Sequence, residues 1–119
     1  MRVLVCGGRD FAGVGALHIV MNAIHALRPV TLLIHGAARG ADSAAANWAR
    51  HQGIETAAFP ADWDTHGKRA GYVRNRQMLV EGKPDLVVAF PGGRGTAMMC
   101  DIATKAGVLV IDAAPFCPV

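Results

Sequence analysis

The sequence lacks the features that mark a membrane protein or a disulfide-stabilised secreted protein. Its 119 residues include three cysteines, which lie far apart and form no C-x-x-C pair, so no disulfide framework is indicated. No apolar run approaches the about 18 residues that a membrane span requires. The apolar segment 1–6 is interrupted by Gly7 and Gly8, which favours a strand over a signal peptide. We therefore expect a cytoplasmic protein with core cysteines and no membrane partner.

Aromatic residues and concentrated charge are also scarce. Phe, Trp and Tyr make up 6% of the residues, and the net charge of +3 is not gathered in a single run. Surfaces that bind single-stranded nucleic acid combine basic grooves with aromatic side chains, so we do not expect a nucleic-acid partner. The sequence contains no Walker motif, no nucleophile elbow and no residue spacing that matches a known metal-ligand pattern. Accordingly, no metal and no cofactor are predicted.

Short apolar segments instead alternate with helical patterns along the whole chain. We expect strands at residues 2–6, 30–35, 54–59, 85–90 and 108–111, helices at 12–27, 41–52, 68–80 and 96–106, and irregular segments at 60–67 and 113–119. Such alternation is typical of a parallel sheet covered by helices on both faces. Right-handed crossovers then give an α/β, Rossmann-like, doubly wound fold of five strands in the order 3-2-1-4-5. We expect residues 1–119 to form a single domain.

The glycine-rich turn at residues 91–96 is the principal functional candidate. It follows the apolar run 86–90 and contains Gly92, Gly93, Arg94, Gly95 and Thr96. Glycine lets the backbone approach a ligand closely, and the unpaired amides of a new helix attract anions. We expect Thr96 to cap this helix or to donate its hydroxyl to a phosphate. A tight turn without a ligand is the structural alternative.

Two further loops are predicted at the same edge of the sheet. The first, after residues 2–6, contains Gly7, Gly8 and Arg9. Ligands of doubly wound folds bind where the strand order reverses, which here lies between the first and fourth strands. The loop after residues 30–35 contributes further candidates, which are His35, Gly36, Arg39 and Asp42. Asp42 is expected either to cap the next helix or to accept hydrogen bonds from a ribose or base, and His35 to be held by backbone hydrogen bonds or to act as a base.

Basic side chains are concentrated after the predicted strands. Seven of the twelve Lys and Arg residues lie there, namely Arg9, Arg39, Lys68, Arg69, Arg74, Arg76 and Arg94. Such an arrangement suits a small anionic ligand. Arg74 and Met78 share a helix face, so Arg74 is expected near the core edge, with Asn75 beside it. Trp63 is expected in a mobile flap, where it either stacks on a base or closes over the pocket. The helix face with His18, Asn22 and His25 is expected to be solvated.

At these motifs the sequence resembles the SLOG superfamily, which includes the LOG phosphoribohydrolases and the DNA-processing protein DprA. The similarity is greatest to small bacterial and phage SLOG proteins. It rests on residues 7–11, 35–42, 61–63, 70–71, 74–75, 78 and 89–96. It implies a nucleotide or nucleotide-derived ligand at the crevice between the first and fourth strands, and the apolar content permits a homodimer.

The resemblance leaves enzymatic activity in doubt. LOG hydrolases carry a catalytic glutamate three residues after the Thr of the PGGxGT motif, and this position is Met99 here. A thioether cannot transfer protons as a carboxylate does. Asp101 lies about 200° further around the helix. Binding or sensing of a nucleotide is therefore the leading hypothesis. The alternatives are a LOG-like hydrolase of nucleoside monophosphates that uses Asp10, Asp42 or Asp101, and single-stranded DNA binding as in DprA.

Overall fold

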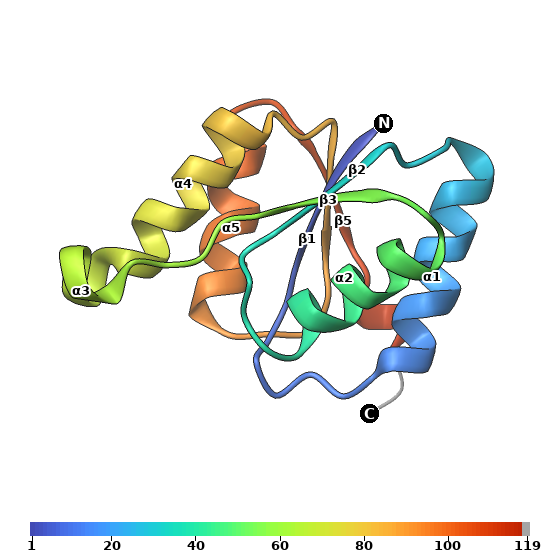
Figure 1. Cartoon of the computed structure of the whole chain (residues 1–119), viewed down its shortest axis with the longest axis horizontal. Helices are drawn as coiled ribbons and strands as arrows, with labels where there is room; N and C mark the ends of the chain where they lie inside the picture. The colour runs from blue at the N-terminus through green and yellow to red at the C-terminus, as the bar shows by residue number, and fades with distance from the viewer. Residues whose placement is uncertain (118–119) are drawn as a thin grey trace.

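The computed structural model describes residues 1–117 and consists of five strands and their connecting helices (Figure 1). The strands are β1 Arg2–Cys6, β2 Leu32–His35, β3 Glu55–Ala58, β4 Leu86–Ala89 and β5 Leu109–Asp112. The α-helices are α1 Val14–Leu27, α2 Ala41–His51, α3 Trp63–His66, α4 Ala70–Gly82 and α5 Arg94–Lys105. Two 3₁₀ turns, Gly67–Arg69 and Ala114–Phe116, complete the list.

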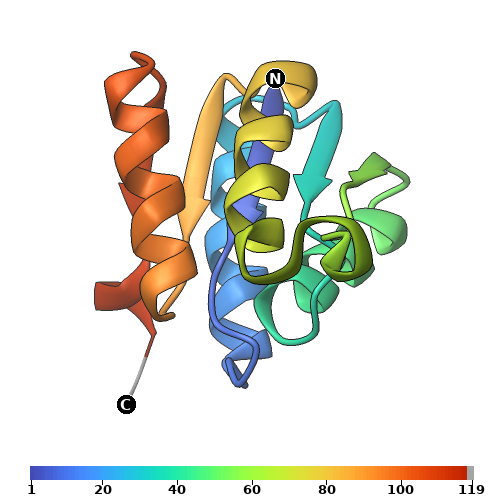
Figure 2. The ribbon, with the colours of Figure 1, turned by 90° about the vertical axis from the view of Figure 1, so that its left-hand side faces the viewer.

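All strand pairs are parallel, and the sheet order is β3-β2-β1-β4-β5. The prediction of a Rossmann-like doubly wound fold with the order 3-2-1-4-5 is thus confirmed. Helices α1 and α2 cover one face of the sheet, while α4 and α5 lie side by side on the other (Figures 1 and 2). The order reverses between β1 and β4, so the loops after these two strands emerge at the switch point of the sheet.

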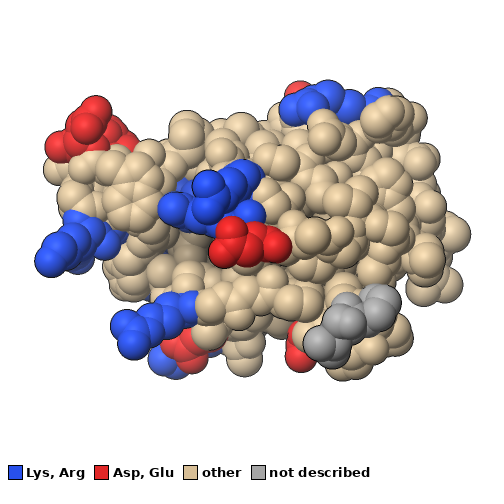
Figure 3. Space-filling view, turned by 90° about the horizontal axis from the view of Figure 1, so that it is seen from below, with Lys and Arg blue, Asp and Glu red and all other residues tan. Residues whose placement is uncertain are grey.

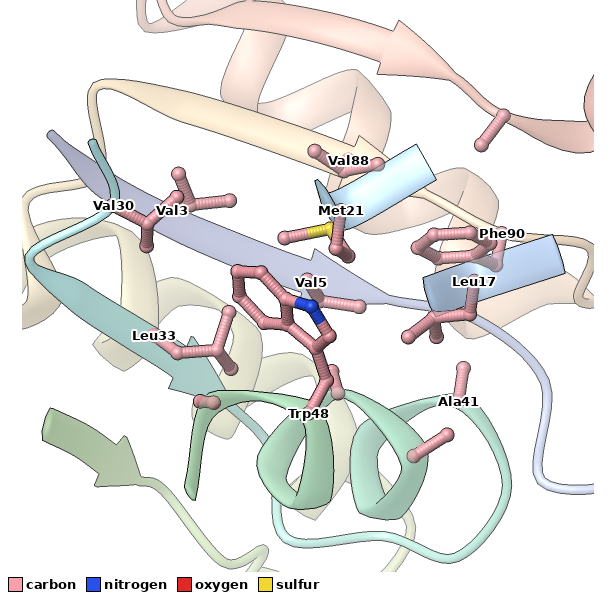
Figure 4. Close-up of a cluster of buried hydrophobic side chains, with 14 of the residues drawn as sticks. Val3, Val5, Leu17, Met21, Val30, Leu33, Ala41, Trp48, Val88 and Phe90 are labelled. Carbon is pink, nitrogen blue, oxygen red and sulfur yellow. The ribbon is translucent and has the colours of Figure 1, made fainter. Parts of the chain in front are cut away.

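The alternation of side chains along each strand divides the core into two layers. Val3 and Val5 of β1 face α1 and α2, whereas Leu4 and Cys6 face α4 and α5. In the first layer, Trp48 of α2 is 1% exposed and packs among side chains of the sheet and of α1 (Figure 4). Its indole Nε1 donates to the Asn22 side-chain oxygen at 2.8 Å. The buried indole therefore has its polar atom satisfied.

The expectation that the α1 face with His18, Asn22 and His25 is solvated was partly wrong. Asn22 accepts the hydrogen bond of the buried Trp48, and the His25 Nδ1 accepts one from the Val30 amide at 2.9 Å. The His25 ring also meets Trp48 edge-on, with 5.8 Å between the ring centroids. These polar groups join α1 to α2 and to the entry of β2, a role that helical spacing alone does not reveal.

Most expected boundaries differ by one or two residues, and two differences bear on the site. Residues 60–67, expected to be irregular, contain the short helix α3, because the Asp62 carboxylate caps it by accepting from the Thr65 amide at 3.1 Å and from its hydroxyl at 2.7 Å. Helix α5 begins at Arg94 rather than Thr96, and its N-cap position is Gly93, which supplies no side-chain cap. The expected capping role of Thr96 was therefore wrong, and Thr96 lies in the first turn. Of the expected irregular tail, residues 118–119 lie outside the described part.

None of the helices in the described part of the chain has the length and hydropathy needed to cross a bilayer.

The two tryptophans should contribute very differently to stability. Trp48→Ala removes a buried side chain and is expected to lower the free energy of unfolding by about 3–5 kcal/mol. Trp63 is 50% exposed, so Trp63→Ala should change it by less than about 0.5 kcal/mol. Urea denaturation of both variants measures the difference. Equal losses would contradict this assignment of the core.

Candidate functional site

The loops after β1 and β4 are in direct contact. The Gly8 amide donates to the Pro91 carbonyl at 2.8 Å, immediately beyond the parallel pairing of Cys6 with Ala89. A Cβ added at Gly8 would lie 3.1 Å from the Pro91 oxygen, and one added at Gly92 would lie 2.7 Å from the Gly8 nitrogen and even closer to the Thr96 hydroxyl. Gly92 is therefore required for the close packing of the two loops, and a side chain at Gly8 would be in tight contact with the loop after β4.

The loop after β2 packs against the same place. The Ala41 amide donates to the Gly8 carbonyl at 3.2 Å. Gly40 has φ of +77°, and a Cβ there would lie 2.6 Å from the Arg9 carbonyl oxygen. A Cβ at Gly7 would lie 2.5 Å from the Ala41 Cβ. Three loops from β1, β2 and β4 thus form one continuous rim at the carboxyl edge of the sheet.

Asp42 fixes the shape of the third loop from within the first turn of α2. Its Oδ2 accepts hydrogen bonds from the amides of Gly36 at 3.1 Å and Ala38 at 3.3 Å. The N-cap position of α2 is Gly40, so Asp42 does not cap the helix in the usual manner. Burial raises the pKa of Asp42, although the two amides and the guanidinium of Arg74 act in the opposite direction.

His35 serves the backbone of its own loop. It is 7% exposed, and its Nδ1 accepts from the Ala37 amide at 3.1 Å. Because Nδ1 is the acceptor, the neutral ring carries its proton on Nε2. Burial, and secondarily Arg50, lowers the pKa of His35. Its arrangement matches the interpretation of a histidine held by backbone hydrogen bonds.

Arg74 and Asn75 connect α4 to two of the loops. The Arg74 Nη1 donates to the Gly36 carbonyl at 2.6 Å, and its Nε donates to the Asn75 side-chain oxygen at 2.9 Å. The Asn75 Nδ2 then donates to the Gly95 carbonyl at 3.2 Å. This chain of hydrogen bonds runs from the loop after β2 to the first turn of α5, so it holds Arg74 in a defined position.

A cavity of about 300 Å³ lies where these elements meet. Its lining comes mainly from the three loops, from the first turns of α2 and α5, and from α3 and α4, and it includes Gly7, Gly8, Arg9, Asp42, Trp63, Arg74, Asn75, Gly93, Gly95 and Thr96. An adjoining cavity of about 340 Å³ shares Arg9, Ala38, Trp63 and Arg74 with it. Figure 3 views this edge of the molecule and shows Lys and Arg side chains around a hollow in its left half.

The structure does not bring every predicted residue into the first cavity. Gly36 and Arg39 line the adjoining cavity instead, while His35, Gly92 and Arg94 line neither of the two. Arg39 pairs with Asp10 at 3.4 Å, and both side chains are largely exposed. Conversely, Cys6, assigned to the core by sequence, also lines the first cavity, as does Gly71.

Trp63 and Arg9 line both cavities and contact each other. The Arg9 guanidinium carbon lies 5.7 Å from the centroid of the Trp63 ring, a distance typical of a cation–π contact. The two residues come from α3 and from the loop after β1, far apart in sequence. Their contact places a flat, half-exposed aromatic surface and a positive charge at the mouth of the site.

Gly93 and Gly95 differ from the other glycines of the rim. An added Cβ at either position would meet no atom within 4 Å. Packing among the described residues therefore gives no reason for glycine at these two positions, in contrast to Gly8 and Gly92. Both residues line the cavity at the start of α5, where the first amides of a helix have no intrahelical acceptor.

The three carboxylates considered as replacements for a catalytic glutamate have different surroundings. Asp101 pairs with Lys105 at 3.0 Å, and Asp10 pairs with Arg39. Neither lines the cavity, whereas Asp42 does. Met99, at the position of the LOG glutamate, is fully buried in the core layer beneath α4 and α5. Only Asp42 among these three has a carboxylate at the site.

Comparison with known proteins gives a family match, a similar protein and a solved structure with the same fold. The family model for the YspA, cpYpsA-related SLOG family (YAcAr) matches residues 1–66. The Gene 61 protein of Mycobacterium phage D29 is 37% identical to this chain, and the match covers 93% of this chain and 94% of that protein. The X-ray structure of DNA processing protein A (DprA) from Streptococcus pneumoniae has a TM-score of 0.55 at 17% identity and shares the fold. The match covers 97% of this chain and 59% of the DprA chain.

Alanine substitution of two rim glycines should have opposite effects on the stability of the fold. Gly92→Ala places a methyl group against the Gly8 amide and is expected to destabilise the fold by about 1–3 kcal/mol. Gly95→Ala enters open space on a helix and should leave stability unchanged or raise it by up to about 1 kcal/mol. Thermal unfolding of both variants tests this. A loss of stability in G95A as large as that in G92A would be the contrary result.

His35 should make stability depend on pH. Its pKa is lowered on folding, so its contribution is fully present above the unfolded pKa of about 6.5 and is lost as the pH falls through the folded value. His35→Asn keeps an acceptor for the Ala37 amide but does not titrate. Between pH about 7.5 and about 5, the wild type should therefore lose more stability than H35N. Parallel unfolding curves for the two proteins would refute a buried neutral His35.

Proposed function

The chain belongs to the YspA, cpYpsA-related SLOG family, and from this premise we propose that its cavity binds a nucleotide or nucleotide-derived ligand that carries a phosphate. The sequence-based identification of the SLOG superfamily is confirmed. The observation that carries the proposal is the convergence of a helix N-terminus, two arginines, a carboxylate and a half-exposed indole on one cavity. Each of these groups suits a different part of a nucleotide.

The phosphate would lie at the start of α5. Gly93 and Gly95 leave the backbone open there, and the first amides of the helix, together with its dipole, favour an anion. The Thr96 hydroxyl lines the same part of the cavity and can donate to a phosphate oxygen. The glycines without a packing role support this placement most directly.

Arg74 supplies a cation that an anionic ligand would neutralise. Burial lowers the pKa of Arg74, with Asp42 acting in the opposite direction and Arg9 in the same direction. Its hydrogen bonds within the described residues use Nε and Nη1, so Nη2 remains available for a ligand in the cavity that Arg74 lines. A partly desolvated guanidinium gains strongly from a charge-assisted contact with phosphate.

The sugar and base would occupy the side of the cavity that Asp42 and Trp63 line. Asp42 uses Oδ2 for the loop amides, and no buried side-chain N or O atom of the described residues lacks a partner. The Asp42 Oδ1 forms no hydrogen bond within the described residues, so it must keep contact with solvent. It can therefore accept a hydrogen bond from a ribose hydroxyl or a base amino group. The Trp63 indole offers a surface on which a base can stack.

We propose binding rather than cleavage. Met99 is buried in the core, and Asp101 and Asp10 pair with basic side chains and do not line the cavity. Hydrolysis would have to rely on Asp42, whose Oδ2 already accepts two amide hydrogen bonds. Single-stranded DNA binding is less well supported, because the similarity to DprA concerns the fold and Trp63 is the only aromatic side chain among the lining residues of the two cavities.

Ligand-induced stabilisation tests the proposal. Each nucleoside 5′-monophosphate is added to the chain, and the matching nucleoside without phosphate serves as the comparison. At 100 times its Kd, a bound nucleotide should raise the free energy of unfolding by about 2.7 kcal/mol. Arg74→Gln should weaken binding by at least about tenfold, because a charge-assisted hydrogen bond is worth about 1.5–3 kcal/mol.

Arg76→Gln is the matched control, because Arg76 lies on the same helix and does not line the cavity. Its guanidinium carbon lies 5.8 Å from the centroid of the Tyr72 ring instead. Shifts are compared with the unliganded midpoint of each variant, which removes any effect of Arg74 on folding. No shift with any monophosphate, or equal shifts with nucleosides, would argue against a phosphate site. Release of free base that Asp42→Asn abolishes would establish the hydrolase alternative, and salt-dependent binding of an oligonucleotide would favour DNA.

A further inference from the structure

A further cavity is lined by the end of β2, by the loop that follows it and by one face of α2. Its volume is about 350 Å³, and its lining residues are His35, Ala37, Ala38, Ser43, Ala46, Asn47 and Arg50. Of these, Ala38 alone also lines the cavity assigned to the nucleotide. The further cavity is therefore distinct from the proposed nucleotide site, although the same loop contributes to both.

His35 offers this cavity a ring donor without a protein partner. The residue is 7% exposed and lines this cavity, but neither of the two cavities described above. Its Nδ1 accepts from the Ala37 amide at 3.1 Å, so the neutral ring carries its proton on Nε2. The Nε2 forms no hydrogen bond within the described residues, in which no fully buried side-chain nitrogen or oxygen lacks a partner. The Nε2–H therefore keeps contact with solvent and is available to a ligand in the cavity.

Arg50 and Asn47 add a positive charge and further donors. Ser43, Asn47 and Arg50 follow each other at spacings of four and three residues along α2, so they share one face of the helix. The Arg50 Nη1 donates to the Asn47 Oδ1 at 2.7 Å. This bond holds the two side chains together and leaves the Arg50 Nη2 and the Asn47 Nδ2 without acceptors among the described residues. The Ser43 hydroxyl is already used, because it donates to the Ala38 carbonyl at 2.9 Å.

The charge of the cavity lining has one sign. Its residues include Arg50 but neither Asp nor Glu. The adjacent Asp42 lines the nucleotide cavity instead, and its Oδ2 accepts from the amides of Gly36 and Ala38. Burial, followed by the charge of Arg50, lowers the pKa of His35, so the ring is neutral at physiological pH and keeps the Nε2–H donor. The free groups of the cavity are thus hydrogen-bond donors and one permanent cation.

We propose that this cavity binds a small oxyanion, which is the phosphoryl or carboxylate group of a ligand. The His35 Nε2–H, the Arg50 guanidinium and the Asn47 amide each donate to its oxygens, and charge-assisted hydrogen bonds of this kind are among the strongest in proteins. The proposal gives His35 a ligand-binding role outside the nucleotide cavity. It does not rest on nucleotide binding, because Arg74, Gly93 and Gly95 do not line this cavity.

NMR of the His35 ring tests the proposal. The ¹⁵N-labelled chain is titrated at pH about 7.5 with sodium phosphate or with sodium acetate, and sodium chloride keeps the ionic strength constant. The His35 Nε2 and the Asn47 side-chain amide should shift saturably, while the Nδ1 keeps the shift of an acceptor. Saturation by phosphate at the lower concentration identifies a phosphoryl site, and saturation by acetate at the lower concentration identifies a carboxylate site. No saturable shift with either anion, or the same shift with chloride alone, would overturn the proposal.

A charge placed inside the cavity should act differently from the same charge outside it. Asn47→Asp keeps an acceptor for Arg50 but puts a carboxylate among the donors, and it should weaken oxyanion binding at least about tenfold. Gln52→Glu is the matched control, because Gln52 follows α2 and does not line the cavity. It should change binding less than about twofold. Both positions are exposed, so both variants should fold. Equal losses in N47D and Q52E would show a general charge effect and contradict the site.

Arginine variants separate this cavity from the proposed nucleotide site. Arg50→Gln should weaken oxyanion binding by about fivefold or more, whereas Arg28→Gln, which removes an exposed arginine that does not line the cavity, should not. Arg74→Gln should leave the shift of the His35 Nε2 unchanged even if it abolishes nucleotide binding. Loss of the His35 shift in R74Q rather than in R50Q would place the anion in the nucleotide cavity and overturn the proposal.

Discussion

The hydrogen bond between the Gly8 amide and the Pro91 carbonyl, 2.8 Å long, brings together the two loops on which the candidate site depends. It extends the pairing of β1 with β4 beyond the last strand residues, and a Cβ at Gly92 would lie only 2.7 Å from the Gly8 nitrogen that donates this bond. The loop after β2 then packs on Gly8 through the Ala41 amide. A constraint on backbone packing at the switch point therefore creates the rim of the cavity.

On this rim, glycine has two separate uses. A Cβ at Gly40 or Gly92 would overlap neighbouring atoms and one at Gly8 would be in tight contact, whereas Gly93 and Gly95 face open space at the start of α5. Arg74, anchored to the loop after β2 and through Asn75 to α5, places a partly desolvated cation beside that open backbone. This combination supports a phosphate site more strongly than a glycine-rich motif does by itself, because the motif alone is equally consistent with a tight turn.

The sequence predicted the sheet order and the meeting of the glycine loops, because apolar strands, crossover handedness and strand-end glycines are strong signals. It did not predict the start of α5, since Gly93 occupies the N-cap position without a side-chain cap, and Thr96 looked like a better cap. The roles of Asn22 and His25 were missed because their partners, Trp48 and Val30, lie on other elements. The same reason applies to the contact of Arg9 with Trp63, since helical and strand periodicity report only contacts within one element.

A phosphate bound at the open backbone at the start of α5 can be detected by a two-dimensional NMR titration of the ¹⁵N-labelled chain with a nucleoside monophosphate. We expect the amide resonances of Gly93, Gly95 and Thr96 to shift most, together with the side-chain signals of Arg74. The corresponding nucleoside should leave them in place. Shifts confined to other surfaces, or equal shifts with nucleotide and nucleoside, would contradict this placement of the phosphate.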